Sequence, residues 1–346
     1  MNVNSSVVDV RERVYALMQQ RQFDEAFELL AQACRQQPGV GYEQLLAQSR
    51  LEAFTSDPPR FVPREPAQKV GENSFAEVEG IPEIQASDLS TAIAAAAIRY
   101  HGALLVRGLV PESKAVQLAS GVRQALDACA AWRSKPTDDS FDSPWYSRIP
   151  LPEGSTTPRE REWLEADGWG VWTADSPRML FELTELFKST GITNLVAEYF
   201  GERPMMSVKK CVLRCVPSTI KVADWHQDGA FMGREIGSMN VWLSLSHCGY
   251  DASGLECLPH RLTEIVPTGS HGAHIDWSIG PGMVDIVAKG RPTVSPVFAP
   301  GDALIFDHLF LHRTSIPAAI AKDRYAIESW FFASTGYPAG QVPLWL

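Results

Sequence analysis

The spacing of hydrophobic residues changes along the chain from helix-like to strand-like near Met206. Upstream, apolar residues recur at helical intervals, as Val10, Val14 and Leu17 do at i, i+4 and i+7. Downstream, short runs rich in β-branched and aromatic residues alternate with Gly- and Pro-containing turns. We expect strands at 207–216, 239–246, 262–266, 293–298, 303–306 and 324–332. An α-rich half followed by a β-rich half predicts an α+β protein whose strands form a sandwich or barrel.

The sequence predicts three parts. Residues 1–55 form a helical extension, in which residues 22–30 are similar to a tetratricopeptide helix hairpin. One hairpin cannot bury its apolar face alone, so we expect it to pack on the rest of the chain, on a second copy in a homodimer, or on a partner protein. Residues 56–85 are rich in Pro and polar side chains and are expected to be a linker. Residues 86–346 form the main domain.

Composition narrows the class of protein. The net charge of −10 argues against nucleic-acid binding, which needs a basic surface. The six cysteines contain no Cys-x-x-Cys pair and are too sparse for a disulfide framework. The chain has neither a secretory signal pattern nor a run of about 18 apolar residues. We therefore expect a cytoplasmic enzyme with reduced thiols that acts on a small molecule and does not bind membranes.

A candidate metal site lies at Trp225-His226-Gln227-Asp228-Gly229. Side chains two residues apart point to the same face of a β-strand, so a strand here would present His226 and Asp228 together. An imidazole from a distant strand would complete two nitrogens and one carboxylate, the facial triad of non-heme Fe(II) oxygenases. His308 and His312 are both candidates for that third ligand.

The chain resembles the phytanoyl-CoA dioxygenase family of Fe(II)/2-oxoglutarate oxygenases. The resemblance covers about residues 86–346, with Thr268 standing where the family usually has Pro. Five blocks carry it, in the family's order: His-Gly-Ala-Leu-Leu-Val-Arg-Gly-Leu-Val (101–110), Trp-His-Gln-Asp-Gly (225–229), Asn-Val-Trp-Leu-Ser-Leu (240–245), Pro-Thr-Gly-Ser-His (267–271) and Gly-Asp-Ala-Leu-Ile-Phe-Asp with Leu-His-Arg-Thr-Ser (301–315).

This resemblance implies a double-stranded β-helix, a cupin-like jelly roll flanked by helices. It also implies Fe(II) at His226, Asp228 and His312, since His312 matches the family's Leu-His-x-x-Ser pattern. The chemistry implied is decarboxylation of 2-oxoglutarate by O2 to succinate and CO2, coupled to hydroxylation of a substrate C–H bond. A carboxylate at Asp228 favours hydroxylation over halogenation, because related halogenases have a small residue there.

The resemblance also implies residues that bind 2-oxoglutarate. Arg324, twelve residues after His312, is expected to bind its far carboxylate, which suits a planar guanidinium. Trp242 matches a family position beside the cosubstrate. Lys209 and Lys210 lie where the family often has a polar contact, and sequence parity leaves open which of them faces the site.

Two alternatives stay open. The first is a cupin-type metalloenzyme that does not use 2-oxoglutarate and has no need of Arg324. The second is a catalytically silent binding protein of the same fold. The sequence does not identify the substrate.

Overall fold

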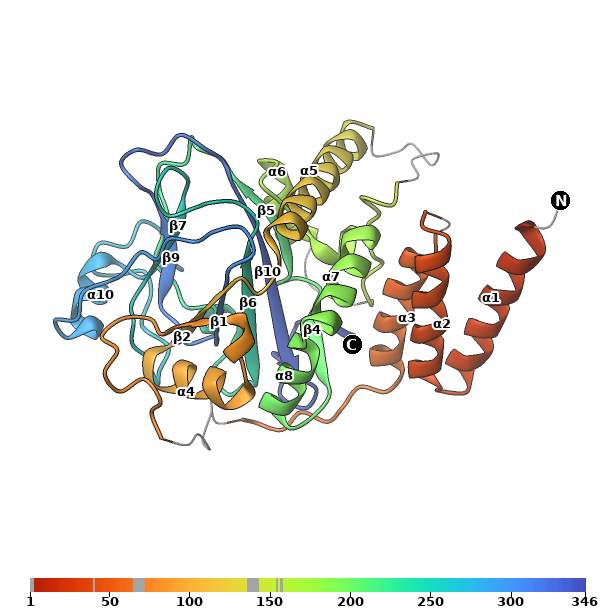
Figure 1. The fold of residues 1–346 in the computed structure, drawn as a ribbon, viewed down its shortest axis with the longest axis horizontal. Helices are drawn as coiled ribbons and strands as arrows, with labels where there is room; N and C mark the ends of the chain where they lie inside the picture. Colours follow the sequence, from red (N-terminus) through yellow and green to blue (C-terminus); the bar gives the residue numbers. More distant parts are fainter. Residues whose placement is uncertain (1–2, 40, 65–71, 136–142, 154, 156–157) are drawn as a thin grey trace.

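The structure is a computed structural model that describes residues 3–39, 41–64, 72–135, 143–153, 155 and 158–346. Figure 1 shows its elements in sequence colours. The helices are α1 (Val3–Gln19), α2 (Phe23–Gln36), α3 (Tyr42–Ser56), α4 (Thr91–His101), α5 (Glu112–Ser134), α6 (Pro158–Ala166), α7 (Pro177–Ser189), α8 (Ile192–Phe200), α9 (Gly229–Met232) and α10 (Pro281–Ala288). The strands are β1 (Glu83–Gln85), β2 (Ala103–Arg107), β3 (Gly170–Trp172), β4 (Pro204–Ser207), β5 (Val212–Val216), β6 (Ser238–Ser244), β7 (Gly254–Cys257), β8 (Ala303–Phe306), β9 (His312–Ser315), β10 (Arg324–Ala333) and β11 (Pro343–Trp345).

Two sheets form the main domain. The larger has the order β1-β2-β8-β6-β10-β4-β11, with β5 pairing to both β10 and β3. The smaller is the antiparallel pair β7–β9, and Figure 1 shows it lying apart from β6 and β10. Isolated bridges between Trp225 and Ile279, and between His226 and His312, extend the smaller sheet. The α+β class and jelly-roll architecture expected from the sequence are confirmed.

The strand β10 lies in the middle of the larger sheet, with β6 on one side and β4 and β5 on the other. Its residues alternate between the two faces of the sheet. Phe331 points to the helices and meets Phe187 of α7 at 5.3 Å. Trp330 points the other way and meets Phe306 of β8 at 5.8 Å. The face that carries Trp330 also carries Arg324 and is the inner face of the barrel.

Three strand predictions were wrong in part. The run 207–216 is broken at 208–211, where the Ser207 hydroxyl accepts a bond from the Lys210 N–H. The run 262–266 is not a strand, because the Val266 N–H bonds to the Gln227 side chain instead of a neighbouring strand. The run 293–298 contributes single bridges only; it includes Pro296, which has no N–H to donate.

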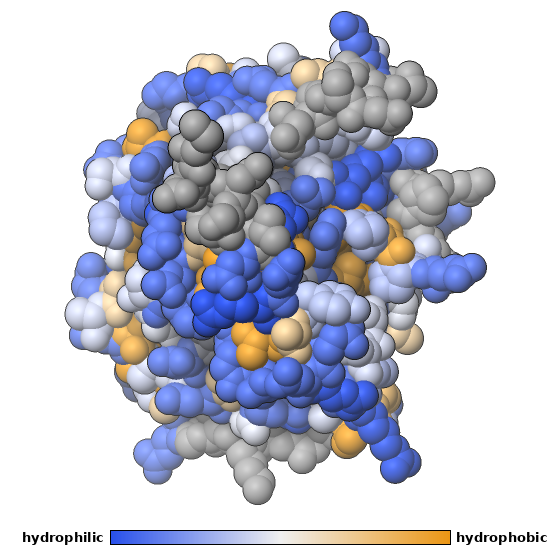
Figure 2. Space-filling model, turned by 90° about the vertical axis from the view of Figure 1, so that its right-hand side faces the viewer, coloured by the Kyte–Doolittle hydropathy of each residue, from blue (hydrophilic) through white to orange (hydrophobic). Residues whose placement is uncertain are grey.

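The helices α1, α2 and α3 pack beside the main domain, at the end away from β7, β9 and α10 (Figure 1). Their hydrophobic core includes Leu30, Leu46 and Val14, and it extends to Phe181 of α7 and to Trp345. The outer surface of this end is covered mainly by hydrophilic side chains, with small hydrophobic patches between them (Figure 2). From α1, Val14 and Met18 are buried in this core.

The linker between α3 and β1 is attached to the main domain in its first half. Arg64 forms an ion pair with Glu202 at 2.6 Å and donates to the carbonyl of Phe200. The Val62 N–H donates to the carbonyl of Thr335.

No helix among the described residues is long and apolar enough to cross a membrane. All six cysteines are free thiols.

Candidate metal centre

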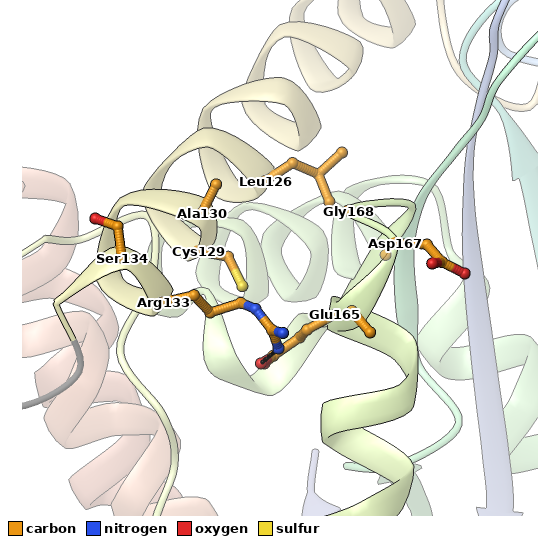
Figure 3. A pocket seen from close by; sticks show the side chains of 10 residues that line it. Leu126, Cys129, Ala130, Arg133, Ser134, Glu165, Asp167 and Gly168 are labelled. Carbon is orange, nitrogen blue, oxygen red and sulfur yellow. Dashed lines mark ion pairs between the residues drawn. The ribbon is translucent and has the colours of Figure 1, made fainter.

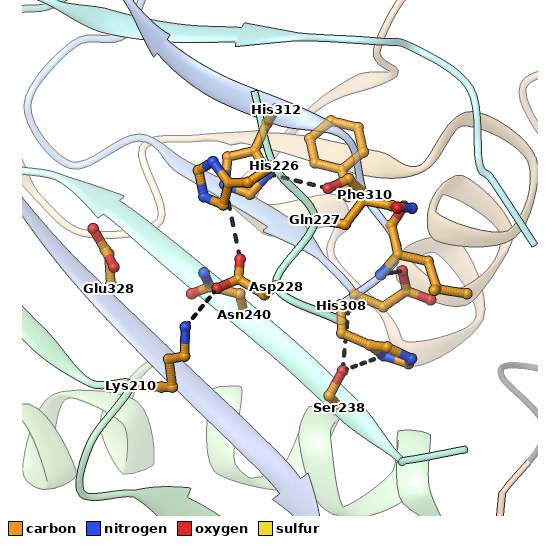
Figure 4. A network of polar contacts seen from close by, with 12 residues as sticks. Lys210, His226, Gln227, Asp228, Ser238, Asn240, His308, Phe310, His312 and Glu328 are labelled. Atoms are coloured by element: carbon orange, nitrogen blue, oxygen red, sulfur yellow. Dashed lines mark hydrogen bonds and ion pairs between the residues drawn. The ribbon is translucent and has the colours of Figure 1, made fainter. Parts of the chain in front are cut away.

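Three side chains from two segments that are far apart in the sequence meet at one end of the barrel. His226, Asp228 and His312 each offer a ligand atom, and these atoms lie within 4.8 Å of one another. The Nε2 atom of His312 is 3.9 Å from Oδ2 of Asp228, and the two imidazole centroids are 4.5 Å apart. Figure 4 shows the three side chains converging on one point. Two imidazoles and a carboxylate form the donor set of a facial triad.

The backbone brings the two histidines together through a pair of bonds. The His226 N–H donates to the His312 carbonyl at 3.0 Å, and the His312 N–H donates back at 3.1 Å. The expectation that His226 and Asp228 share a strand face was wrong. Asp228 has helical angles, φ −62° and ψ −24°, and is the N-cap residue of the short helix α9. A turn, rather than strand alternation, therefore points its carboxylate at the histidines.

Both imidazoles are oriented by backbone carbonyls. Nδ1 of His226 donates to the carbonyl of Asp224 at 3.1 Å, and Nδ1 of His312 donates to that of Phe310 at 3.1 Å. A carbonyl only accepts hydrogen bonds, so the proton lies on Nδ1 in both rings and the Nε2 lone pair is free. This arrangement is typical of metal-binding histidines.

The ionisation states of Asp228 and His312 also fit a cation. Burial raises the pKa of Asp228, but Lys210 and the two histidines outweigh it and lower that pKa to about 2. Burial, together with the neighbouring His226, lowers the pKa of His312 to about 4. At neutral pH the site thus holds one carboxylate and a neutral His312, the protonation states that metal ligation requires.

The structure separates the two lysines that the sequence left undecided. Nζ of Lys210 lies 3.1 Å from Oδ1 of Asp228 and above the ring of Phe231. Nζ of Lys209 instead donates to the carbonyl of Gly340 at 2.8 Å. The expected cosubstrate contact for Lys209 is therefore not supported, because the bend at 208–210 turns consecutive side chains in different directions.

His308 lies near the centre, but both of its ring nitrogens are already bonded. Nδ1 accepts from the Ser238 hydroxyl at 2.7 Å, and Nε2 donates to the Arg234 carbonyl at 2.9 Å. Its own carbonyl accepts from the Gly229 N–H at 2.8 Å. His308 thus fixes the start of α9 next to Asp228 and has no free nitrogen for a metal.

Gln227 is a positioning residue that the sequence reasoning missed. It lies between His226 and Asp228 in the sequence, and its side chain is fully buried. The amide nitrogen donates to the Leu309 carbonyl at 2.6 Å, and the amide oxygen accepts from the Val266 N–H at 2.7 Å. Gln227 thereby holds the segments on either side of His226 and Asp228. The position of this glutamine between two candidate ligands was the sequence signal that could have indicated its role.

Arg324 is a buried cation without an anion. Only 2% of it is exposed, and among the described residues no carboxylate lies within ion-pair distance of its guanidinium. One Nη donates to the Gly254 carbonyl at 2.9 Å, while Nε is buried with no hydrogen-bond partner. Burial lowers the pKa of Arg324 to about 10, so it stays charged at neutral pH. Such a group requires a compensating anion.

Trp242 is packed against this cation. It lies on β6, opposite Glu328 of β10, and its ring centroid is 5.5 Å from the Arg324 guanidinium carbon. It is buried and also contacts Phe298. Trp242 thus forms a wall beside the guanidinium, and its place beside a cosubstrate stays a prediction.

A pocket of about 410 Å³ lies between α5, α6 and β3 (Figure 3). Its buried carboxylate, Glu165, accepts bonds from Tyr146 at 2.7 Å and Arg148 at 2.6 Å. Burial raises the pKa of its thiol, Cys129, to about 12. The pocket therefore holds a carboxylate that is paired with an arginine and a thiol that stays protonated at neutral pH. None of its residues belongs to the metal-ligand group.

The family model described as phytanoyl-CoA dioxygenase (PhyH) matches residues 98–315, more than half of the chain. The chain belongs to the phytanoyl-CoA dioxygenase family. The matched range contains all three clustered ligands and ends nine residues before Arg324. No curated protein sequence matches the chain.

Three solved structures are among those similar to this chain. EctD from S. alaskensis, with 2-oxoglutarate and 5-hydroxyectoine, is 15% identical, with a TM-score of 0.46 over 79% of this chain and 83% of that one. SnoK, a non-heme alpha-ketoglutarate-dependent carbocyclase from nogalamycin biosynthesis, is 11% identical, with a TM-score of 0.45 over 72% and 87%. EvdO2 from Micromonospora carbonacea var. aurantiaca, complexed with 2-oxoglutarate, is 16% identical, with a TM-score of 0.44 over 72% and 90%.

Proposed function

We propose that this protein is an Fe(II)- and 2-oxoglutarate-dependent oxygenase that hydroxylates a C–H bond of a small molecule. One observation carries the proposal: a two-His, one-carboxylate cluster shares the barrel interior with Arg324, a buried cation that pairs with no carboxylate of the described residues. The cluster suits Fe(II), because that metal is commonly bound by mixed nitrogen and oxygen ligands without thiolate. Three protein ligands also leave positions on the metal open. The guanidinium suits the far carboxylate of 2-oxoglutarate.

Each group has a defined task in this proposal. His226, Asp228 and His312 would hold the iron, with their orientation fixed by the Asp224 and Phe310 carbonyls and by Lys210. When bound, iron, 2-oxoglutarate and O2 supply the oxidising chemistry, with release of succinate and CO2. Arg324 and the Trp242 wall would bind and orient 2-oxoglutarate, and the apolar barrel interior would exclude water.

Succinate formation tests the proposal. The protein is loaded anaerobically with Fe(II) and 2-oxoglutarate, exposed to O2, and assayed for succinate. We expect slow succinate release without substrate, which the His312→Ala variant lacks. A protein that binds iron but never consumes 2-oxoglutarate, with any candidate substrate, would instead be a cupin-type metalloenzyme or a silent binding protein.

A further inference from the structure

A second pair of charges lies on the inner face of the barrel. Nε of Arg214 on β5 is 2.7 Å from Oε1 of Glu328 on β10. Arg214 pairs with Ala326 in the sheet register, so the two side chains lie diagonally on neighbouring strands. Residues 324, 326 and 328 share one face of β10. Arg214 and Glu328 therefore face the same interior as Arg324.

The ion pair leaves polar atoms of both partners available. The bond joins Nε and Oε1, and in the part of the chain that the structure describes neither side chain has another hydrogen bond. The side chain of Arg214 is 23% exposed and that of Glu328 is 24% exposed, so solvent reaches both of them. The terminal guanidinium nitrogens of Arg214 and Oε2 of Glu328 are thus open to a ligand.

The fold does not require charges here. The neighbours Ala326, Trp330 and Trp242 on the same face are apolar and buried. Replacing an interior ion pair by packed apolar residues is often neutral or stabilising. A role in binding explains the charges better than a role in stability.

The pair also lies beside the metal centre. Figure 4 shows Glu328 on the same side of the cluster as Lys210, without a direct bond to the three candidate ligands. The next residue on the same face toward the N-terminus of β10 is Ala326, and the one after it is Arg324. Glu328 and Arg324 thus lie on one face of β10, separated by Ala326.

We propose that Arg214 and Glu328 bind the substrate of the oxygenase, and that this substrate carries a carboxylate and an ammonium on neighbouring atoms, as an α-amino acid does. This inference rests on the proposed function. The Arg214 fork suits the carboxylate, and the free oxygen of Glu328 accepts from the ammonium. A ligand with a single charge would bind one member of the pair and leave the other without an opposite charge on the ligand.

The first test uses the full chain loaded with Fe(II) and 2-oxoglutarate. Each of the twenty L-amino acids is added, and succinate is measured after exposure to O2. We expect at least one amino acid to accelerate succinate release, and its N-acetyl and methyl ester forms to be inactive. If 2-oxoglutarate is slowly consumed but no amino acid accelerates it, this inference is wrong and the proposed function stands. If 2-oxoglutarate is never consumed, both are wrong.

The second test separates recognition from structure. Calorimetry measures binding of the active amino acid to Glu328→Gln, to Arg214→Gln and to the charge swap Arg214→Glu with Glu328→Arg. We expect each single variant to bind about tenfold more weakly or worse, and the swap to regain thermal stability without regaining binding. A swap that restores binding would show that the pair is merely structural. Glu28→Gln, at the exposed ion pair with Arg35, is the matched control and should bind normally.

Discussion

At the scale of single residues, what separates His312 from His308 is whether a ring nitrogen is free. Nε2 of His312 faces the other ligands, whereas both nitrogens of His308 are bonded. We predict that His312→Ala abolishes Fe(II) binding, and that His308→Ala keeps about one iron per chain while lowering thermal stability. Iron content and thermal unfolding of the two purified variants check this. Loss of iron from His308→Ala alone would reverse the assignment.

Arg324 has a separate prediction, because we propose that it binds cosubstrate and not metal. Removing one partner of a buried charge pair costs about 3–5 kcal/mol, which is roughly a hundredfold or more in affinity. We predict that Arg324→Ala raises the KM for 2-oxoglutarate by at least that factor while Fe(II) still binds. The KM of Arg324→Lys should lie between those of the wild type and Arg324→Ala, since lysine keeps the positive charge but cannot donate two parallel hydrogen bonds to a carboxylate. Equal 2-oxoglutarate kinetics in all three proteins would contradict the assignment.

The lowered pKa of His312 predicts how stability depends on pH in protein stripped of metal by a chelator. The unfolded chain protonates this side chain near pH 6.5, whereas the folded protein resists protonation down to about pH 4. The unfolded state thus binds more protons in that range, so stability falls as pH falls from 6.5 to 4, by about 3 kcal/mol in all. Denaturant unfolding at several pH values measures it. In His312→Gln the slope should be visibly smaller; an unchanged slope would exclude this origin.

At the scale of elements, the ligand-bearing segment 225–229 depends on Gln227 instead of a strand ladder. We predict that Gln227→Leu lowers the free energy of unfolding by about 3 kcal/mol, because it leaves buried backbone groups of Leu309 and Val266 without partners. Iron affinity should fall as well, since both neighbours are ligands. Urea unfolding and iron titration measure the two effects. Gln117→Leu on the exposed face of α5 is the control, and equal stability of the two variants would refute the role.

The elements also show which sequence patterns were sufficient to predict a strand and its ends. The strand β8 was predicted with its observed ends, and β10 within one residue. Both strands are paired on two sides, β8 is a continuous apolar run, and β10 is rich in aromatic residues. The prediction failed at 262–266, where a side chain from another segment takes the Val266 N–H. Propensity cannot register a partner that is distant in sequence.

At the scale of the whole molecule, the three N-terminal helices pack against α7 and the C-terminal strand, away from the ligand cluster (Figure 1). We propose that residues 1–55 are a stabilising extension and not part of the active site. A chain starting near Phe75 should therefore still consume 2-oxoglutarate. It should unfold at a lower temperature, because Phe181 and Trp345 lose their cover.

Uncoupled 2-oxoglutarate turnover and circular dichroism compare the shortened chain with the full one. A shortened chain that is folded but consumes no 2-oxoglutarate would show that the helices belong to the active site. Size-exclusion chromatography of both would test whether the helices also join two copies.

The sequence by itself determined the class of fold and the candidate ligands, because hydrophobic period and the spacing of His226, Asp228 and His312 are local or family-wide patterns. The tertiary structure decided the rest. It brought Lys210, and not Lys209, to Asp228, and it left Arg324 without a carboxylate partner among the residues that the structure describes. It also placed Arg214 beside Glu328, which lies 114 residues away. These facts depend on which side chains meet across the barrel, and strand pairing over such distances is set by the packing of the whole domain.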